Sequence, residues 1–427
     1  MGRQAEEIIS GLQNGVYDEV LRKIYIDESV LQMQRERYVK AIQEYIGLFG
    51  NAEVEIYSAP GRSEIGGNHT DHQHGKVLAS SVNIDIIAVV SPTDDQMVHF
   101  KSEGYDRIDT SVADPVIDES IFGTTRSLIH GIAAGLRKRG YQAGGFNAYA
   151  TSQVLSGSGL SSSAAFEILV GNILSGLYNE EKLDAVTLAQ IGQEAENIYF
   201  GKPSGLMDQM ACSVGGLIFI DFADPKTPQV KKVDVDFSVF KHSLCIVDTK
   251  GSHADLTDDY AAIPVEMCKV AAYFGKKVLR EVDEAAFYQA LPEIRKAAGD
   301  RAVLRAIHFF DENARVDEEV AALQKGDFEA FKAIAMESGQ SSYKYLQNVY
   351  ACHKPEEMSV AVSLVMTKKL LGDKAAYRVH GGGFAGTIQA FIPDDAVAAY
   401  KEGMEKLLGE GSCHVMKVRP IGGCKVL

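Results

Sequence analysis

The sequence of 427 residues lacks the features that mark membrane, secreted and nucleic-acid-binding proteins. It contains no run of about 18 apolar residues, which argues against a membrane span, and residues 1–7 are charged, without the apolar core of a secretion signal. Its six cysteines are scattered without a CxxC pair, as expected of reduced cytoplasmic thiols. With 58 acidic against 43 basic residues, the net charge of −15 opposes non-specific binding to nucleic acid or anionic lipid. We therefore expect a cytoplasmic protein whose partners are neither nucleic acid nor membrane.

No internal repeat or low-complexity linker is present, and 46% hydrophobic with 24% charged residues is typical of globular proteins. Hydrophobic spacing predicts helices over residues 1–50, and strands alternating with helices after them. From Tyr260 to Leu371 the pattern is almost wholly helical, and strands return around a glycine cluster at Tyr377 to Pro393. These shifts predict the following division: an N-terminal helical extension (1–30), an N-terminal lobe (31–240) and a C-terminal lobe (241–427).

A loop rich in glycine and serine joins a predicted strand (146–154) to an amphipathic helix; it reads Leu155-Ser156-Gly157-Ser158-Gly159-Leu160-Ser161-Ser162-Ser163. Glycines allow backbone N–H groups to converge on one point, and the positive end of the helix dipole favours an anion there. The loop has no lysine, so it is not the GxxxxGK[ST] phosphate loop. These residues alone predict either a phosphate-binding loop or a serine-rich turn that caps the helix.

A segment of polar and ionisable residues follows another predicted strand. Residues 54–58 predict a strand that ends in a turn at Ala59-Pro60-Gly61-Arg62. The ionisable side chains after this turn are His69, Asp71, His72 and His74. They can ligate a metal such as zinc or iron, bind the hydroxyl groups of a polyol, or lie in solvent.

Two other segments carry candidate site residues. Asp208 lies among apolar residues just after a helix-breaking Gly201-Lys202-Pro203, where an aspartate is either a helix cap or a functional carboxylate. The cluster His380 to Gly386 contains Gly381, Gly382 and Gly383. It forms either a flexible turn or a place where the backbone approaches a ligand closely.

Taken together, these segments resemble the motifs of the GHMP small-molecule kinases, most closely those of the galactokinase family. In chain order, the segments that carry the resemblance are Ala59-Pro60-Gly61-Arg62 with Asn68-His69-Thr70-Asp71, Leu160-Ser161-Ser162-Ser163-Ala164-Ala165, Gly205-Leu206-Met207-Asp208-Gln209 and His380 to Gly386. Their order and spacing agree with the family over residues 35–425. The resemblance implies an α+β fold with a mixed α/β N-terminal lobe, a helix-rich α+β C-terminal lobe and an active site between them.

The activity that the resemblance implies is ATP-dependent phosphorylation of galactose at its anomeric (C1) hydroxyl, giving galactose 1-phosphate. ATP, Mg²⁺ and the sugar would be its ligands, and the protein would be a monomer or weak oligomer. Asp208 would be the catalytic carboxylate, and Arg62 would lie beside it and offset charge on the transferred phosphoryl group. An adjacent arginine lowers the pKa of an aspartate by roughly 1–3 units, so Asp208 would be a weak base.

The resemblance also assigns binding residues. Those implied for ATP and its phosphates are Gly157, Ser158, Gly159, Leu160, Ser161, Ser162 and Ser163. Those implied for Mg²⁺ are Ser162 or Ser163, and Glu196. Those implied for the sugar are Asn68, His69, Asp71, Asp208 and Tyr260, with Gly381, Gly382 and Gly383 forming the C-terminal glycine motif.

The chain departs from the family pattern at several positions. The family carries glutamate where this chain has Asn68, an aromatic residue at His72 and a glycine at Ala385. Because an amide both donates and accepts whereas a carboxylate only accepts, Asn68 leaves open another sugar, such as N-acetylgalactosamine or arabinose.

A catalytically silent sugar sensor is a further alternative, although the serine loop, Asp208 and Arg62 are intact. A metal hydrolase built on the histidines is another, and it leaves the loop and glycine motif unexplained.

Overall fold

The computed structural model describes residues 2–154, 159–252 and 255–427. They form two compact units: unit 1 comprises Met1–Ser63, Ser80–Gly216 and Arg419–Leu427, and unit 2 comprises Glu64–Ala79 and Leu217–Val418. Strands β2 (Glu53–Gly66) and β3 (Lys76–Thr93) run from one unit into the other. The single boundary expected near residue 240 therefore does not coincide with the compact units, and the lobes 31–240 and 241–427 stay a prediction.

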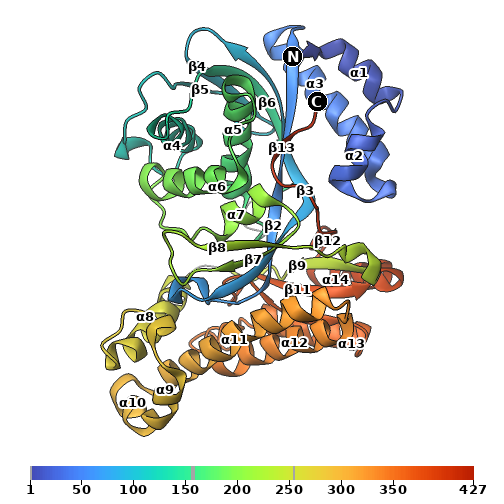
Figure 1. Ribbon diagram of the computed structural model, residues 1–427. Coiled ribbons are helices and arrows are strands. Elements are labelled where there is room, and N and C mark those ends of the chain that lie inside the picture. The colour runs from blue at the N-terminus through green and yellow to red at the C-terminus, as the bar shows by residue number, and fades with distance from the viewer. Residues whose placement is uncertain (1, 155–158, 253–254) are drawn as a thin grey trace. The chain divides into compact units, whose positions relative to one another are not determined.

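Unit 1 is organised around a mixed β-sheet (Figure 1). Its further strands are β1 (Arg3–Gln4), β4 (Met97–Ser102), β5 (Ile108–Ser111), β6 (Gly145–Ser152) and β13 (Cys424–Lys425). The order is β1-β2-β3-β6-β4-β5, with β13 paired to β2. β3 and β6 are antiparallel, whereas β4 and β6 are parallel. β6 ends at Ser152, shortly before the serine loop in the sequence.

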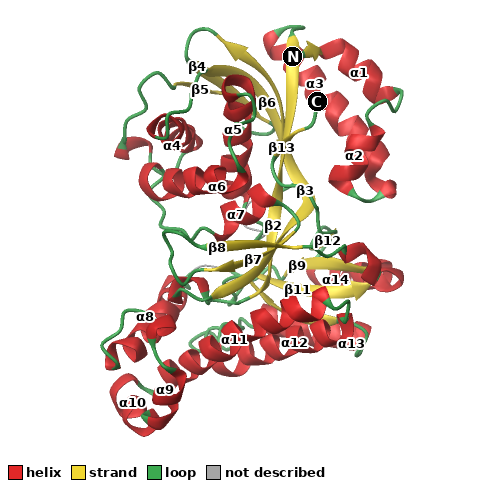
Figure 2. Cartoon of the chain, in the orientation of Figure 1, coloured by secondary structure: helices red, strands yellow, loops and turns green. Residues whose placement is uncertain are grey.

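Helices cover both faces of this sheet (Figure 2). The helices of unit 1 are α1 (Ala5–Gln13), α2 (Asp18–Tyr25), α3 (Leu31–Phe49), α4 (Thr125–Lys138), α5 (Ser162–Asn179), α6 (Ala185–Glu194) and α7 (Met207–Val214). Side chains alternate across a strand, so Ile87 and Val89 of β3 pack with α1–α3 in one core. On the other face, Phe100 of β4 meets Phe166 of α5 edge to face. The helices predicted over residues 1–50 are confirmed.

A buried ionic cluster joins both ends of the chain to this sheet. Asp85 of β3 is fully buried and pairs with Arg37 of α3 at 2.7 Å and with Arg419 at 3.2 Å. The Tyr25 hydroxyl of α2 donates to the same carboxylate at 2.9 Å. Burial opposes ionisation, but the two guanidinium groups hold the pKa of Asp85 below its usual value. The N-terminal helices are therefore an integral part of unit 1.

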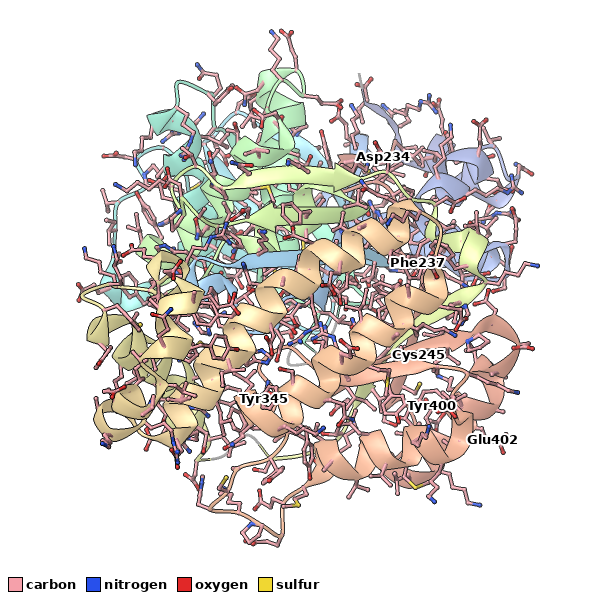
Figure 3. The ribbon with its side chains drawn as sticks, turned by 60° about the horizontal axis from the view of Figure 1, so that its bottom comes forward. Asp234, Phe237, Cys245, Tyr345, Tyr400 and Glu402 are labelled. Carbon is pink, nitrogen blue, oxygen red and sulfur yellow. The ribbon has the colours of Figure 1, made fainter. Side chains whose placement is uncertain are left out.

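Unit 2 contains an antiparallel sheet in the order β10-β11-β9-β12. These strands are β10 (Ala376–His380), β11 (Thr387–Pro393), β9 (His242–Asp248) and β12 (Cys413–Met416), and β7 (Leu217–Asp221) pairs with β8 (Gln229–Val233) elsewhere in the unit. The helices are α8 (Thr257–Tyr273), α9 (Glu284–Gln289), α10 (Leu291–Ala298), α11 (Asp300–Gln324), α12 (Phe328–Ser341), α13 (Ser359–Leu371) and α14 (Val397–Leu408). Cys245 of β9 and Tyr400 of α14 belong to one buried core (Figure 3).

Two sequence expectations need correction or refinement, and one helix has an irregular end. Residues 59–62 form no turn, because β2 continues to Gly66. Helix α6 continues beyond Glu194 as one π-helical turn, Ala195–Tyr199. The strand region 377–393 is two strands, β10 and β11, separated by the glycine motif. None of the helices in the described residues combines the length and apolar character of a membrane span.

Candidate active site

Arg62 and Asp208 form the centre of the candidate site in unit 1. Arg62 lies on β2 and is largely buried, and Asp208 lies in the first turn of α7. The guanidinium contacts both carboxylate oxygens, with Nε–Oδ1 at 2.7 Å and Nη2–Oδ2 at 2.9 Å. Such a bidentate contact fixes distance and orientation together. The Asp208 side chain is 32% exposed, which leaves it accessible to a ligand.

The pKa of Asp208 follows from these contacts. Burial raises it, but the charge and hydrogen bonds of Arg62 and a hydrogen bond from the Ser161 hydroxyl together hold it below its usual value. Asp208 is therefore ionised at neutral pH and is a weak proton acceptor. The structure places Arg62 beside Asp208, as expected, and their catalytic roles stay a prediction.

The end of the serine loop is anchored to the same arginine. Arg62 donates from its backbone N–H to the Leu160 carbonyl at 3.1 Å and from Nη1 to the Gly159 carbonyl. A Cβ on Gly61 would lie 3.1 Å from the Leu160 carbonyl oxygen. Pro60 and Gly61 therefore mark a close approach of loop and strand, which explains why the expected turn is absent. The predicted phosphate residues Gly157 and Ser158 lie outside the described residues.

Ser161 connects the loop to the carboxylate. It has a left-handed backbone, with φ of 58°, and its hydroxyl donates to Asp208 Oδ2 instead of capping α5. A non-glycine residue in this conformation is uncommon and occurs most often where a site requires it. Ser161 therefore provides no side-chain cap for the first N–H groups of α5.

A second acidic group lies next to the loop. Glu196, in the π-helical turn, is 2% exposed and accepts from Ser163 Oγ at 3.1 Å and from Lys202 Nζ at 2.9 Å. Gln209 Nε2 donates to Glu196 at 2.8 Å and to the buried Glu167 at 2.9 Å. Burial and the nearby Glu196 raise the pKa of Glu167 well above its usual value, which favours the protonated form of this carboxyl group.

These residues fit a magnesium ion. Mg²⁺ prefers oxygen ligands and is commonly held by one or two carboxylates together with phosphate oxygens. The hydroxyl of Ser163 and the carboxylate of Glu196 supply such oxygens side by side, and Ser162 precedes them at the start of α5. The buried Oε1 atoms of Glu167 and Gln209 have no hydrogen-bond partner. The pair Ser163–Glu196 was predicted for the metal, whereas Glu167, Gln209 and Lys202 were missed.

The polar loop after β2, with Asn68, His69 and Asp71, lies in unit 2. Asn68 is fully buried, and its Nδ2 donates to Glu64 Oε1 at 3.0 Å and to the Gly381 carbonyl at 2.8 Å. His69 places Nε2 at 3.1 Å from the Gly382 carbonyl and Nδ1 at 3.2 Å from His72 Nε2. The structure therefore brings the polar loop after β2 and the glycine motif together.

Tyr260 and Asp71 complete this group. The Tyr260 hydroxyl donates to the Gly383 carbonyl at 2.9 Å, and its ring lies edge to face with Phe384. Asp71 is partly exposed. Burial lowers the pKa of His72 to about 4, so the histidine is neutral at pH 7. Among the described residues no group of three or more His, Cys, Asp or Glu is arranged to hold a metal ion, so the metal site considered at His69, Asp71, His72 and His74 is not formed.

Long-range partners of the signature were not predicted. His308 Nε2 lies 2.9 Å from the Asn68 carbonyl, and Glu312 Oε1 accepts from the Asn68 N–H at 3.1 Å. Both residues lie on the buried side of α11. The sequence gives one signal for these two residues: they are polar or charged but occupy positions of a long helix that face the apolar core. Burying an unpaired charge there costs free energy.

Comparison with known proteins agrees with this geometry. Residues 127–216 match the family model of the GHMP kinases N terminal domain, and residues 43–92 match the galactokinase galactose-binding signature. The chain is similar to a galactokinase from Lactococcus lactis complexed with galactose, with a TM-score of 0.75 and 24% identity over 90% of this chain and 98% of that chain.

More distant structures share the fold. A mevalonate kinase from Methanococcus jannaschii matches with a TM-score of 0.58 and 15% identity, over 85% of this chain and 98% of that chain. A phosphomevalonate kinase from Streptococcus pneumoniae matches with a TM-score of 0.58 and 13% identity, over 85% and 99%. The family resemblance and the α+β fold class predicted from the sequence are thereby confirmed. The chain has the fold of the GHMP kinases and carries both their N-terminal domain and the galactokinase signature, so it is galactokinase-like in fold and motif.

Proposed function

We propose that this chain is an ATP-dependent sugar kinase that transfers the γ-phosphoryl group of ATP to the anomeric hydroxyl of galactose, with galactose 1-phosphate and ADP as products. The observation that carries the proposal is the bidentate contact of Arg62 with Asp208, next to a serine loop. The galactose-binding signature over residues 43–92 supports the choice of a sugar as acceptor.

Asp208 would orient the attacking hydroxyl by accepting its hydrogen bond, and would take its proton as the new P–O bond forms. Phosphoryl transfer has a loose transition state in most analyses, so positioning and charge stabilisation matter more than a strong base. This suits a carboxylate whose pKa is held low by Arg62. The same guanidinium would offset negative charge on the transferred phosphoryl group.

The phosphates of ATP would lie at the serine loop, where Gly159, Leu160 and Ser161 are joined to Arg62 and Asp208. Ser163 or Ser162, together with Glu196, would hold Mg²⁺. When bound, this ion supplies charge neutralisation along the phosphate chain. The buried position of Glu196 means that its carboxylate is held in place before any ligand arrives.

The sugar would bind in unit 2, where Asn68, His69 and Tyr260 contact the glycine motif and Asp71 is partly exposed. The family carries glutamate at the position of Asn68, so the same chemistry on N-acetylgalactosamine or arabinose is the second candidate. Discrimination against a sugar that leaves a buried polar group unpaired can reach about 10⁴-fold, so one residue can redirect specificity.

The test is ADP release with Mg-ATP across galactose, N-acetylgalactosamine, glucose, arabinose and mevalonate. Turnover with galactose, and product identified as the 1-phosphate by ³¹P and ¹³C NMR, is the expected result. Turnover with another sugar alone would replace galactose as the substrate. Binding of ATP and sugar without turnover would overturn the kinase assignment and leave a sugar sensor.

A further inference from the structure

Helix α13 of unit 2 carries apolar side chains on its exposed side and hydroxyl side chains on its buried side. Val362 is 49% exposed and Val365 is 57% exposed, whereas Ser363 and Thr367 are fully buried. A surface helix normally turns its apolar stripe toward the core and its polar residues toward solvent. Valine is also a poorer helix former than leucine or lysine. Neither burial nor helix propensity therefore explains the two exposed valines.

The buried hydroxyl groups of α13 have partners inside unit 2. Ser363 Oγ donates to the Ser359 carbonyl at 2.8 Å, and Thr367 Oγ1 lies 2.8 Å from the Tyr400 hydroxyl of α14. The helix also packs against β10 and β11. Rotating α13 to bury the valines would break these contacts, so the valines are held on the outside.

Other exposed apolar side chains flank α13 on both sides. Helices α12 and α13 lie next to each other (Figure 1), and a groove of about 370 Å³ between them is lined by Tyr343 and Val365. On the other side, Val362 and Leu407 line a cavity of about 500 Å³. Tyr343 and Leu407 are themselves exposed. A contiguous exposed apolar patch on a protein commonly marks a contact with another protein.

Charged pairs of opposite sign lie at the two ends of this apolar surface. Glu356 and Glu357 lie just before α13 begins. Lys368 and Lys369 lie in its last turn. All four residues are exposed, and the midpoint between the two pairs falls next to Val362. The surface of α13 therefore has an acidic end, an apolar middle and a basic end.

Two of these charged residues have ion pairs within the same molecule. Lys368 contacts Asp373, and Lys354 Nζ lies 4.0 Å from Glu357. Lys368, Asp373 and Glu357 have largely exposed side chains, and exposed ion pairs contribute little free energy. These local contacts can therefore be exchanged for partners on another molecule.

A surface with this order of charges is complementary to a second copy of itself in the antiparallel direction. A two-fold axis next to Val362 places the acidic end of each α13 opposite the basic end of the other, and the apolar middles meet. Two-fold dimers use the same patch on both subunits, so such a patch has to be self-complementary. The parallel direction would bring like charges together, which disfavours association.

We propose that the exposed side of α13 is the interface of a weak two-fold dimer of this chain, in which the two α13 helices are antiparallel. The residues that make up this dimer surface are Glu356, Glu357, Val362, Val365, Lys368 and Lys369. The valines form its apolar centre, and the charged pairs set the direction of the second helix. None of these residues is assigned to ATP, Mg²⁺ or the sugar, so the inference does not depend on the proposed function.

The same charges also act within one molecule. Acidic residues near the start of a helix and basic residues near its end stabilise the helix through its dipole. Reversing both pairs at once separates this effect from dimer formation. The double reversal makes the interaction with the dipole least favourable, but it restores opposite charges between two antiparallel copies.

The first measurement is sedimentation velocity of the full chain at about 1–200 µM, a range that detects weak association. Wild type should shift toward twice the monomer mass as the concentration rises. Val365→Glu should raise the dimer dissociation constant about thirtyfold or more, as expected for a substitution at the centre of an interface. Val239→Glu, at an exposed valine elsewhere in unit 2, is the matched control and should leave the constant unchanged.

The second measurement tests the antiparallel direction with charge reversals. Lys368→Glu combined with Lys369→Glu should weaken the dimer about tenfold, because four acidic side chains then meet at each end. Glu356→Lys combined with Glu357→Lys should have the same effect. All four changes together should return the dissociation constant to within about threefold of wild type.

A matched control for the lysine reversals is Lys276→Glu with Lys277→Glu, another exposed lysine pair of unit 2. A wild-type chain that is monomeric at every concentration would overturn the proposal and leave α13 to a partner of another kind. A dimer that Val365→Glu leaves intact would also overturn it. If Val365→Glu does not fold, the charge reversals decide.

The variant with all four reversals has its own contradicting result. A dimer weaker than that of either pairwise reversal would overturn the antiparallel arrangement and assign the charges to the helix dipole. None of these measurements uses turnover, so they decide the proposal whether or not the chain is a sugar kinase.

Discussion

The two groups of candidate site residues are held in place by different means. In unit 1, Arg62, Asp208 and Ser161 contact one another through charged and hydroxyl groups, and the carboxylate remains partly exposed. In unit 2, Asn68 and Tyr260 donate hydrogen bonds to backbone carbonyls of the glycine motif. Charge in unit 1 holds the residues that we propose to be reactive, whereas hydrogen bonds in unit 2 hold the backbone of a loop. Substitutions in the first should change rate, and those in the second should change loop order and affinity.

The largest effect should come from removing the reactive charge itself. Asp208→Asn keeps the shape but removes the proton acceptor, and turnover should fall by about 10²–10⁴-fold. ATP binding, measured by calorimetry, should remain, because the serine loop is unchanged. Asp224→Asn, an exposed aspartate of unit 2, is the control. Near-normal turnover in Asp208→Asn would show that this carboxylate is not catalytic.

The next effect should come from the arginine that holds this carboxylate ionised. Arg62→Met should lower turnover by about 10²–10³-fold, the usual loss for one charge-stabilising group. It should also shift the pH profile. Without the guanidinium, burial raises the pKa of Asp208, and the acidic limb of the rate profile should move to higher pH. An acidic limb that stays in place would mean that Arg62 does not control the ionisation of Asp208.

Charge in unit 1 also serves stability, and Asp85→Asn separates that role from catalysis. The substitution leaves Arg37 and Arg419 buried without their carboxylate, and removing one partner of a buried ion pair typically costs about 3–5 kcal/mol. Urea unfolding should show this loss. The turnover of the remaining folded protein at low temperature should stay close to wild type. A strong fall in turnover with unchanged stability would show that Asp85 acts in catalysis and not in stability.

A buried acid of unit 2 should give a smaller, pH-dependent effect. Burial raises the pKa of Glu319 well above 4.5, more than Arg378 lowers it, and neither carboxylate oxygen has a hydrogen-bond partner. The folded state therefore retains a proton that the unfolded chain releases above pH 4.5. Stability from this group is complete below that pH and is lost as the pH rises toward the folded pKa.

Glu319→Gln should accordingly make the free energy of unfolding less dependent on pH above 4.5. Urea unfolding at several pH values measures this, and Glu318→Gln, an exposed neighbour, is the matched control. An identical pH dependence in Glu319→Gln and wild type would show that Glu319 is not protonated in the folded protein.

The smallest effect is expected at the edge of the unit 1 site. Lys202 contacts Glu196 at 2.9 Å, but its side chain is 61% exposed, and such ion pairs contribute about 0–1 kcal/mol. Lys202→Met should change the Mg²⁺ concentration for half-maximal activity by less than about fivefold. A change as large as that of Arg62→Met would place Lys202 among the charge-stabilising groups.

Much of the fold could be predicted because local patterns are strong. The helices within residues 1–50, the strand β6 and the helix α5 follow from hydrophobic periodicity, which depends only on neighbouring residues. The turn expected at Pro60 and Gly61 is wrong for a related reason. These residues usually mark turns, but here Gly61 is required by the approach of Leu160, a residue remote in the sequence.

By itself, the sequence determined the family resemblance and the choice of Asp208 and Arg62 as candidate reactive residues, because motif order and spacing can be read along the chain. Only the tertiary structure decided what each polar residue contacts. Asn68 has the chemistry of a sugar ligand, yet burial against Glu64, Asn348 and Gly381 uses all of its hydrogen-bonding groups. Residue type limits which hydrogen bonds a side chain can make, and packing determines which of them it makes.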